Sequence, residues 1–389
     1  MKLPVMTRRS PAPAGGLADS PTQLLITELQ SLGLRLVDPS AGAASRKGGA
    51  GPSDHKAITV DGRTVMVPVH TGQSARSPFL AYAPGADGFG VLERDGVPVG
   101  RISFPPQPRF YGLQTFDGVP YWKIAVLHGA DVLATTVLQT CIRYQNRATT
   151  CQFCAIGQSL AAGRTVARKT PQQLAEVARA AVLLDGVKHM VMTTGTPNTT
   201  DRGARVLCES AFEVKGAVAL PIQGQCEPPD DPAWFRRMRD AGIDTLGMHL
   251  EAVEPEVRAR IMPGKATVSV EAYFDAFGEA VGVFGRGQVS TYILAGLGDS
   301  ADAILRACER LVGLGVYPFV VPFVPISGTP LADHPAPPAD FMRPLLRELG
   351  GMLRAANLSS KDSKAGCGKC GACSSLSAYE ENDGAASCG

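Results

Sequence analysis

Apolar and polar positions follow different periods along this chain of 389 residues. Between residues 20 and 37, apolar side chains recur at helical spacing, which predicts one amphipathic helix. Residues 39–54 are rich in Gly, Ser and Ala and predict a flexible connection. From residue 56 the pattern changes to alternating apolar and polar side chains, which is typical of strands buried on one face. We therefore expect an N-terminal helix and linker over residues 1–55, followed by a β-rich region.

Tight-turn signals divide the alternating region into short segments. Three of the Asp-Gly pairs in this region lie between alternating segments: Asp61-Gly62, Asp95-Gly96 and Asp117-Gly118. Asp-Gly between alternating strands favours a two-residue hairpin, because both central residues of that turn take positive φ. The sequence therefore predicts a small antiparallel β domain over residues 56–131.

Short apolar runs alternate with amphipathic helical segments from about residue 132. The expected strands are 132–140, 189–195, 217–225, 244–252, 288–297 and 317–326. Thr170-Pro171 is a helix start, with Thr as the cap and Pro at the first helical position. Nearly continuous apolar strands separated by helices indicate an α/β fold with a covered parallel sheet. This pattern leaves open a doubly wound stack or a barrel, complete or partial. A last helix over 340–357 and a Ser/Gly/Cys-rich tail complete the C-terminal segment, 333–389.

Charge and hydropathy exclude some classes of partner. Lys and Arg number 38 and Asp and Glu 36, a net charge of +2, so net charge implies neither a nucleic acid nor an acidic partner. No apolar run approaches the roughly 20 residues that a membrane helix needs. The N-terminus has basic residues but no apolar core after them, unlike a secretory signal, so we expect a cytoplasmic protein.

Cysteines gather in two groups. Six of the ten lie close together in sequence: Cys141, Cys151 and Cys154, then Cys367, Cys370 and Cys373. In a chain without a secretory signal, grouped thiols serve metals or redox chemistry more often than disulfides. Cys208 and Cys308 lie in helical patterns, where a buried structural thiol is usual.

The first group has three thiols and no evident fourth ligand. A Cys-x-x-Cys pair can bind zinc, exchange disulfides or bind an iron–sulfur cluster. Structural zinc takes four ligands, whereas no second Cys-x-x-Cys lies nearby, and His128 and His189 are isolated. Three thiolates suit a four-iron cluster that keeps one iron open. Zinc and a redox pair remain the alternatives.

The order of these motifs resembles the radical S-adenosylmethionine (SAM) superfamily, and more narrowly its biotin-synthase-like and lipoyl-synthase-like branch. The resemblance covers most of residues 132–332 and implies a partial (β/α)6 TIM-type barrel there, with the N-terminal β domain and the Cys-rich tail outside it. It implies that Cys141, Cys151 and Cys154 hold a [4Fe–4S] cluster whose open iron chelates SAM. The cysteine spacing here is nine residues and then two, a less frequent variant of three and then two. With its β domain and tail, the chain also resembles a branch often encoded beside nitrilases.

The resemblance further implies a set of SAM contacts. They are Phe153 and Gly296 near the adenine, Thr194, Gly195 and Thr196 at the amino group, Glu251 at the ribose hydroxyls, and Arg258 or Arg260 at the carboxylate. The acidic residue often found beside the threonine segment is absent. Glu251 and Arg258 have a second interpretation, as solvated charges at a strand end and on a helix. His249 alternates with apolar residues and is expected to be packed rather than to bind a ligand.

The tail group has the spacing Cys-x-x-Cys-x-x-Cys, which recurs in ferredoxin-type clusters. We therefore expect a second iron–sulfur cluster on Cys367, Cys370 and Cys373. Its fourth ligand is open among Cys388, Cys226, a non-cysteine residue and the substrate. The alternatives are structural zinc or a disordered metal-binding tail. The tail is too polar to fold alone, so we expect it to be ordered around metal or against the barrel mouth.

These features predict an enzyme that cleaves SAM reductively and uses the 5′-deoxyadenosyl radical on a small-molecule substrate. Sulfur insertion is the first reaction considered, with an electron donor such as flavodoxin or ferredoxin as partner. The alternatives are a non-catalytic iron–sulfur or zinc-binding scaffold or sensor, and an RNA-modifying radical SAM enzyme. The missing basic tract speaks against RNA.

Overall fold

The computed structural model describes residues 19–37, 54–144 and 146–381 and contains two sheets. The larger sheet has the order β13-β12-β11-β10-β9-β8-β7. Six strands pair in parallel: β8 (Val132–Thr136), β9 (His189–Thr193), β10 (Ile222–Gln225), β11 (Thr245–Gly247), β12 (Val289–Ala295) and β13 (Tyr317–Pro322). At one edge, β7 (Val126–His128) pairs antiparallel to β8. The strands are shorter than expected, but their number and parallel order confirm the prediction.

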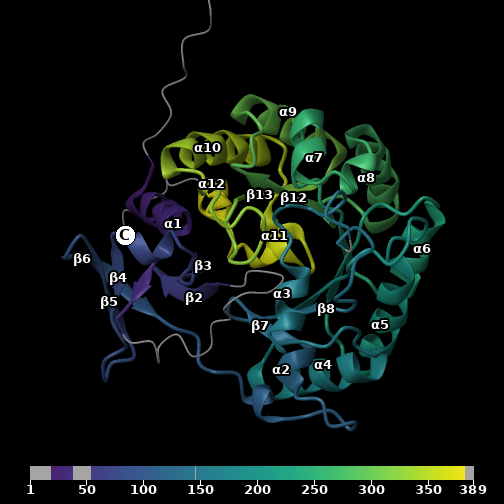
Figure 1. Cartoon of the computed structure of the whole chain (residues 1–389), viewed down its shortest axis with the longest axis horizontal. Helices are drawn as coiled ribbons and strands as arrows, with labels where there is room; N and C mark the ends of the chain where they lie inside the picture. Colours follow the sequence, from purple (N-terminus) through teal and green to yellow (C-terminus); the bar gives the residue numbers. More distant parts are fainter. Residues whose placement is uncertain (1–18, 38–53, 145, 382–389) are drawn as a thin grey trace, which may run out of the picture.

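Helices form an outer ring around this curled sheet (Figure 1). The long ones are α4 (Pro171–Asp185), α5 (Ala204–Ala217), α6 (Ala233–Asp240), α8 (Val270–Phe284), α9 (Ala301–Leu314) and α10 (Ala339–Ala355); the shorter α3 (Ile156–Ala161) and α7 (Pro255–Ile261) lie in loops after strands. Apolar side chains of the sheet and the ring form one continuous core. A partial barrel with helices on its outside is therefore the observed fold. None of the described helices is long and apolar enough to cross a membrane.

Local sequence explains where the helices begin and end. At α4, the Thr170 side chain accepts the amide N–H of Gln173, and the Gln173 side chain accepts the amide of Thr170, a capping box followed by Pro171. The helix ends at Gly186, whose φ of 65° is easily adopted only by glycine. The Thr170-Pro171 prediction is therefore confirmed.

The smaller sheet forms the N-terminal β domain with its own core. Its elements are α1 (Pro21–Leu32), β1 (Arg35–Leu36), β2 (His55–Val60), β3 (Arg63–Pro68), β4 (Phe79–Ala81), β5 (Gly90–Arg94) and β6 (Val97–Ser103). The two hairpin predictions at Asp61-Gly62 and Asp95-Gly96 are confirmed, with positive φ at all four residues. The linker prediction over residues 39–53 lies outside the described residues. Helix α1 (Pro21–Leu32) is shorter than the predicted helix over residues 20–37.

The third Asp-Gly hairpin prediction is wrong. Around Asp117-Gly118 the backbone makes one isolated bridge, between Gln114 and Pro120. Proline cannot donate a ladder hydrogen bond, and α2 (Tyr121–Ile124) begins directly after Pro120. Phe110 and Tyr121 pack in the core of the barrel. The small sheet therefore ends with β6, and the segment that leads to β7 packs with the barrel rather than with the β domain.

The tail enters the barrel from the amino ends of its strands. After α10 come η5 (Ser360–Asp362), α11 (Cys367–Cys370) and α12 (Leu376–Glu380), and α11 lies inside the ring of helices (Figure 1). The amide of Gly366 donates to Nδ1 of His189 at 3.2 Å, and the Thr245 hydroxyl donates to the Ala365 carbonyl at 3.1 Å. His189 and Thr245 are the first residues of β9 and β11. The expectation that the tail reaches the mouth of the barrel is wrong, because it docks at the opposite end.

Candidate active site

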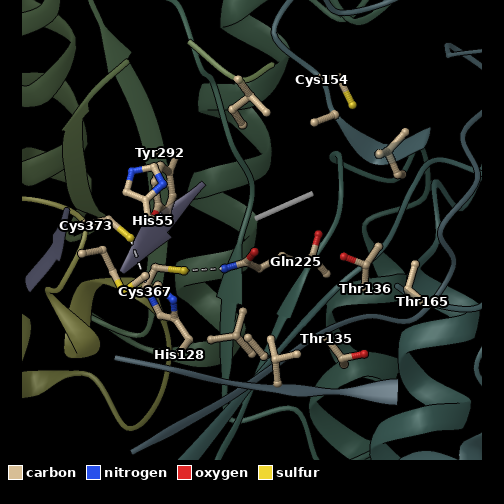
Figure 2. Close-up of a pocket in the computed structure, with 18 of the residues that line it drawn as sticks. His55, His128, Thr135, Thr136, Cys154, Thr165, Gln225, Tyr292, Cys367 and Cys373 are labelled. Atoms are coloured by element: carbon tan, nitrogen blue, oxygen red, sulfur yellow. Dashed lines mark hydrogen bonds between the residues drawn. The ribbon is translucent and has the colours of Figure 1, made fainter. Parts of the chain in front are cut away.

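A cavity of about 530 Å³ occupies the inside of the barrel and extends to the β domain. Cysteines of both groups line it: Cys141, Cys151, Cys154, Cys367 and Cys373. Figure 2 shows Cys154 on one side of this space and the two tail cysteines on the other, with Gln225 between them. Segments more than 200 residues apart in sequence thus contribute thiols to one cavity.

The loop that carries the first group is anchored at both ends. The Ile142 amide donates to the Thr196 carbonyl at 2.9 Å, and the Gln152 amide donates to the Ile261 carbonyl at 2.7 Å. Gly195 allows this close approach, since a Cβ there would lie 2.1 Å from the carbonyl oxygen of Thr140. The loop is therefore held against β9 and α7 although it is longer than the common spacing.

Burial keeps the thiols of Cys151 and Cys154 protonated in the metal-free chain. Burial raises the pKa of Cys151 far above its ordinary value and that of Cys154 to about 11. A thiolate becomes stable there only when a cation replaces the proton, as in a metal–sulfur bond. Among the described residues, no three His, Cys, Asp or Glu side chains are placed around a single metal ion. A cluster binds each thiolate to a different iron, which spaces the sulfurs more widely than one ion does.

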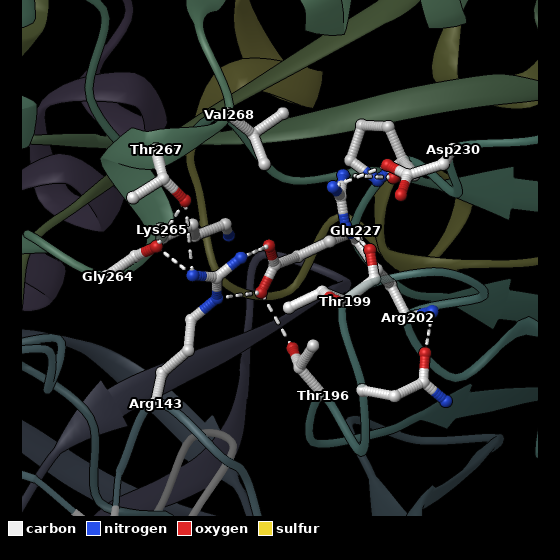
Figure 3. Close-up of polar contacts among 12 residues, drawn as sticks. Arg143, Thr196, Thr199, Arg202, Glu227, Asp230, Gly264, Lys265, Thr267 and Val268 are labelled. Carbon is white, nitrogen blue, oxygen red and sulfur yellow. Dashed lines mark hydrogen bonds and ion pairs between the residues drawn. The ribbon is translucent and has the colours of Figure 1, made fainter.

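Two ion pairs with little exposure to solvent lie beside this loop, and Figure 3 shows the first of them, between Arg143 and Glu227. Arg143 binds both carboxylate oxygens of Glu227, at 2.8 and 2.7 Å, and the Thr196 hydroxyl donates to Glu227 at 2.7 Å. Nζ of Lys265 donates to Oε1 of Glu251 at 3.0 Å. All four charged residues line the cavity. Glu251 takes a φ of 64°, unusual for a residue with a side chain.

The structure separates the expected SAM contacts into two sets. Those that line the cavity are Phe153, Thr194, Gly195, Thr196 and Glu251. Gly296 is not among the lining residues; its φ is 106°, and it packs against Pro337.

Arg258 also lies away from the cavity. It is 2% exposed, and its guanidinium donates to three backbone carbonyls, those of Leu250, Ala252 and Val268. Nη2 of Arg260 donates to the Leu297 carbonyl at 3.2 Å. Neither arginine lines the cavity, and both guanidinium groups donate hydrogen bonds to backbone carbonyls, so the contact with a SAM carboxylate stays a prediction. Arg143 and Lys265 are cations that do line the cavity.

The tail thiols are fixed by the barrel wall. Nε2 of Gln225 donates to Sγ of Cys367 at 3.1 Å, and the Cys367 amide donates to the Gln223 side chain at 3.1 Å. Tyr292 lines the cavity together with Cys367 and Cys373, and burial raises the pKa of its hydroxyl. Burial raises the pKa of Cys370 to about 12. As in the first group, a metal would have to replace the protons.

Glycines let the tail backbone fit inside the barrel. Gly366 has a φ of 113°, and a Cβ there would lie 2.2 Å from Nε2 of Gln223. A Cβ at Gly368 would lie 2.8 Å from the Tyr317 ring. These two glycines are therefore required by packing as well as by the turn around the thiols.

Sequence reasoning missed several residues of this cavity. They are His128, Arg143, Gln225, Glu227, Lys265 and Tyr292. Two signals were available. Arg143 stands two residues after Cys141, and Glu227 stands two residues after the end of the predicted strand 217–225, at the end where parallel-sheet enzymes place their sites. The others come from long-range contacts that local pattern does not encode.

Comparison with known proteins identifies the protein family that part of this chain matches. Residues 146–316 match the model of the Radical SAM superfamily. The chain is 31% identical over 125 residues to a bacteriochlorophyllide c C-7(1)-hydroxylase from Chlorobaculum limnaeum, a match that covers 32% of this chain and 31% of that relative. Residues 146–316 therefore form a radical SAM domain, and that family implies a [4Fe–4S] cluster and SAM. The chain spans about a third of the length of the relative it matches. The biotin-synthase-like branch and the nitrilase association stay predictions.

Parts of several solved structures are similar to parts of this chain. Methylornithine synthase (PylB) is 17% identical with a TM-score of 0.45, over 59% of this chain and 63% of that chain. A radical SAM methyltransferase from Sphaerobacter thermophilus is 16% identical with a TM-score of 0.43, over 72% of this chain and 75% of that chain. The [FeFe]-hydrogenase maturase HydG is 14% identical with a TM-score of 0.43, over 58% and 49%.

Proposed function

We propose that this chain cleaves SAM reductively at a [4Fe–4S] cluster held by Cys141, Cys151 and Cys154, and directs the radical to a small molecule bound between the two cysteine groups. The observation that carries the proposal is that both groups line one cavity of about 530 Å³. That volume lies within the roughly 300–1,000 Å³ of small-molecule sites. A substrate in this space would have the first group on one side and the tail group on the other.

The donor set of the first group fits such a cluster. Each described cysteine is a free thiol, and Cys141, Cys151 and Cys154 all border the cavity. Three thiolates leave one iron without a protein ligand, which is the position SAM would take. When bound, the cluster and SAM would supply the 5′-deoxyadenosyl radical after one electron arrives from a donor such as flavodoxin or ferredoxin.

Residues of the chain would bind and orient SAM. Thr194, Gly195 and Thr196 offer backbone and hydroxyl groups to its amino group, and Phe153 offers an apolar face to its adenine. Lys265 engages Oε1 of Glu251, which leaves Oε2 as an acceptor for the ribose hydroxyls. Apolar wall residues such as Leu294 and Phe323 would keep water away from the reacting carbon.

The tail group would hold a second iron–sulfur cluster through Cys367, Cys370 and Cys373. Its place at the amino ends of the strands puts it across the cavity from the first group. Such a cluster would donate sulfur, carry electrons or anchor the substrate. We propose sulfur insertion first, because a substrate between the groups would meet a sulfide-bearing centre on the side away from SAM.

The test is anaerobic SAM cleavage by reconstituted, reduced protein, with 5′-deoxyadenosine measured by mass spectrometry. Cys151→Ala should abolish 5′-deoxyadenosine, whereas the control Cys208→Ala, outside the cavity, should retain it. Replacing the three tail cysteines by Ala should remove about four iron atoms per chain, retain SAM cleavage and abolish product formation. Absence of 5′-deoxyadenosine from the wild-type protein would refute the proposed function.

A further inference from the structure

We propose that His128 is the fourth protein ligand of the tail cluster, which makes this a three-cysteine, one-histidine site shared between the tail and the β7–β8 turn. The inference rests on the proposed second cluster and extends it to a residue outside the tail. It assigns a ligand role to a histidine that stands alone in the sequence.

The position of His128 is set by the barrel sheet. It is the last residue of β7 and pairs opposite Val132 of β8. Its Nε2 lies 3.5 Å from Sγ of Cys373, and it lines the cavity together with Cys367 and Cys373 (Figure 2). A thiol and an imidazole nitrogen at this distance are joined by a hydrogen bond. A metal that binds both atoms would replace the proton of that hydrogen bond.

The next residue brings the same turn against a second thiol. Gly129 has a φ of 61°, and a Cβ there would lie 3.4 Å from Sγ of Cys370 and 3.7 Å from Cβ of Ala372. His128 therefore meets Cys373 while Gly129 meets Cys370. The end of β7 and the first residue of the turn after it therefore lie against the loop that carries the three thiols. A fourth ligand of the tail cluster would have to lie beside these thiols.

The tail backbone is held to the two neighbouring parts of the protein at this point. The Ala372 carbonyl accepts the Met66 amide at 2.7 Å and the Gln30 side chain at 3.0 Å, both from the β domain. The Ser374 hydroxyl donates to the Val320 carbonyl of β13 at 2.7 Å. The loop between Cys370 and Cys373 is thus positioned before any metal binds, and His128 faces a fixed set of sulfurs.

Cys226 is a poorer candidate for the fourth ligand. Cys226 lines the same cavity, but Gln225, not Cys226, makes the hydrogen bond to Cys367. The groups that act electrostatically on the Cys226 thiol are Glu227, Cys208, Asp201 and Arg202, and no tail cysteine is among them. Cys388 lies outside the described residues. His55, the first residue of β2, also lines the cavity near the tail cysteines and is tested as the competitor.

A neutral imidazole has a measurable consequence for the cluster. It contributes one negative charge less than a thiolate, and histidine ligation raises the reduction potential of iron–sulfur centres. Tyr292, which lines the cavity together with Cys367 and Cys373, would act in the same direction by donating to sulfur. The tail cluster is therefore expected to have a higher potential than the same cluster with four thiolates.

The test isolates the tail cluster. Cys141, Cys151 and Cys154 are replaced by Ala, and the protein is made with isotopically labelled histidine and reconstituted with iron and sulfide. Pulsed electron paramagnetic resonance (EPR) of the reduced sample should show a strongly coupled histidine nitrogen. His128→Ala should lose that coupling, His55→Ala should keep it, and His128→Cys should keep the iron with a lower reduction potential and no nitrogen coupling. Loss of iron in His128→Ala with recovery in His128→Cys would also support the ligand role.

The contrary outcomes separate the two claims. If the parent variant binds no iron, the proposed second cluster fails and the His128 assignment falls with it. If iron is bound without histidine coupling, or the coupling survives His128→Ala, or it disappears in His55→Ala, the second cluster stands and His128 is not its ligand. Circular dichroism of each variant checks that it is folded.

Discussion

The side chains of Arg143 and Glu227 form a buried two-point ion pair that joins the cysteine-bearing loop to the end of β10. Arg143 is 9% exposed and Glu227 is 7% exposed. Burial raises the pKa of Glu227, but the hydrogen bonds and charge of Arg143 and the charge of Lys265 outweigh it, so the pKa lies below the usual range. Glu227 also accepts the Thr196 hydroxyl. One carboxylate therefore fixes the loop relative to two strand ends.

Glu227→Gln should destabilise the protein strongly. The change leaves the Arg143 guanidinium buried without a counter-charge, a loss of about 3–5 kcal/mol for broken buried pairs. Urea unfolding of the metal-free protein measures it. Glu271→Gln, which breaks an exposed pair with Arg310, is the control and should change stability little. Equal stabilities of the two variants would show that the Arg143 pair does not hold the loop.

Replacing Arg258 should affect folding and leave SAM affinity unchanged. Arg258→Lys keeps the charge but cannot donate to the carbonyls of Leu250, Ala252 and Val268 together. Each buried carbonyl left without a donor costs about 1–3 kcal/mol. We expect a lower unfolding midpoint with the same Kd for SAM in calorimetry. A stable variant that binds SAM weakly would instead support the carboxylate role inferred from the sequence.

Gly366→Ala should displace the tail. The new Cβ would lie 2.2 Å from Nε2 of Gln223, and a φ of 113° is strained for alanine. Hydrogen–deuterium exchange of residues 363–381 should lose protection in this variant. Gly313→Ala in α9 is the matched control, because its Cβ meets no atom within 4 Å. Alanine is the better helix former by roughly 1 kcal/mol, so the control should be neutral or stabilising. Unchanged protection in Gly366→Ala would place the tail elsewhere.

Acid should weaken the docked tail through His189. Burial lowers the pKa of His189 to about 4 from 6.5, with Asp131 opposing and Lys369 adding to the shift. The folded state keeps Nδ1 neutral to accept the Gly366 amide, whereas the unfolded state binds a proton below pH 6.5. This contribution to stability is therefore complete above pH 6.5 and is lost as pH falls toward about 4. Urea unfolding at several pH values should show a shallower fall for His189→Gln, which keeps an acceptor. If the stability of the wild-type protein and of His189→Gln fell with pH along parallel curves, the proposed role of His189 would be contradicted.

Periodicity predicted the parts of the fold that local sequence determines. Six apolar strands separated by helices predicted the parallel sheet, and Thr170-Pro171 and Asp61-Gly62 marked a helix start and a hairpin because capping and positive φ depend on a few adjacent residues. The Asp117-Gly118 signal failed because Pro120 cannot donate a ladder hydrogen bond.

Contacts between segments far apart in the sequence could not be predicted from periodicity or from local motifs. The tail docks through polar side chains within strands, such as Gln223, whose partner cannot be read from a local pattern. The resemblance to radical SAM enzymes suggested Arg258 or Arg260 for the SAM carboxylate, but the sequence does not reveal the three carbonyls that hold the Arg258 guanidinium. The two cysteine groups were found by composition, but their shared cavity required the structure.

The central claim is that both cysteine groups carry clusters that face one cavity. EPR spectroscopy of the protein with both clusters reduced tests it most directly. Two spins on opposite walls of a cavity of about 530 Å³ interact magnetically. The account predicts that the spectrum differs, by added splitting or broadening, from the sum of the spectra of the two variants in which either Cys141, Cys151 and Cys154 or Cys367, Cys370 and Cys373 are replaced by Ala. A spectrum equal to that sum, or signals from a single cluster, would contradict it.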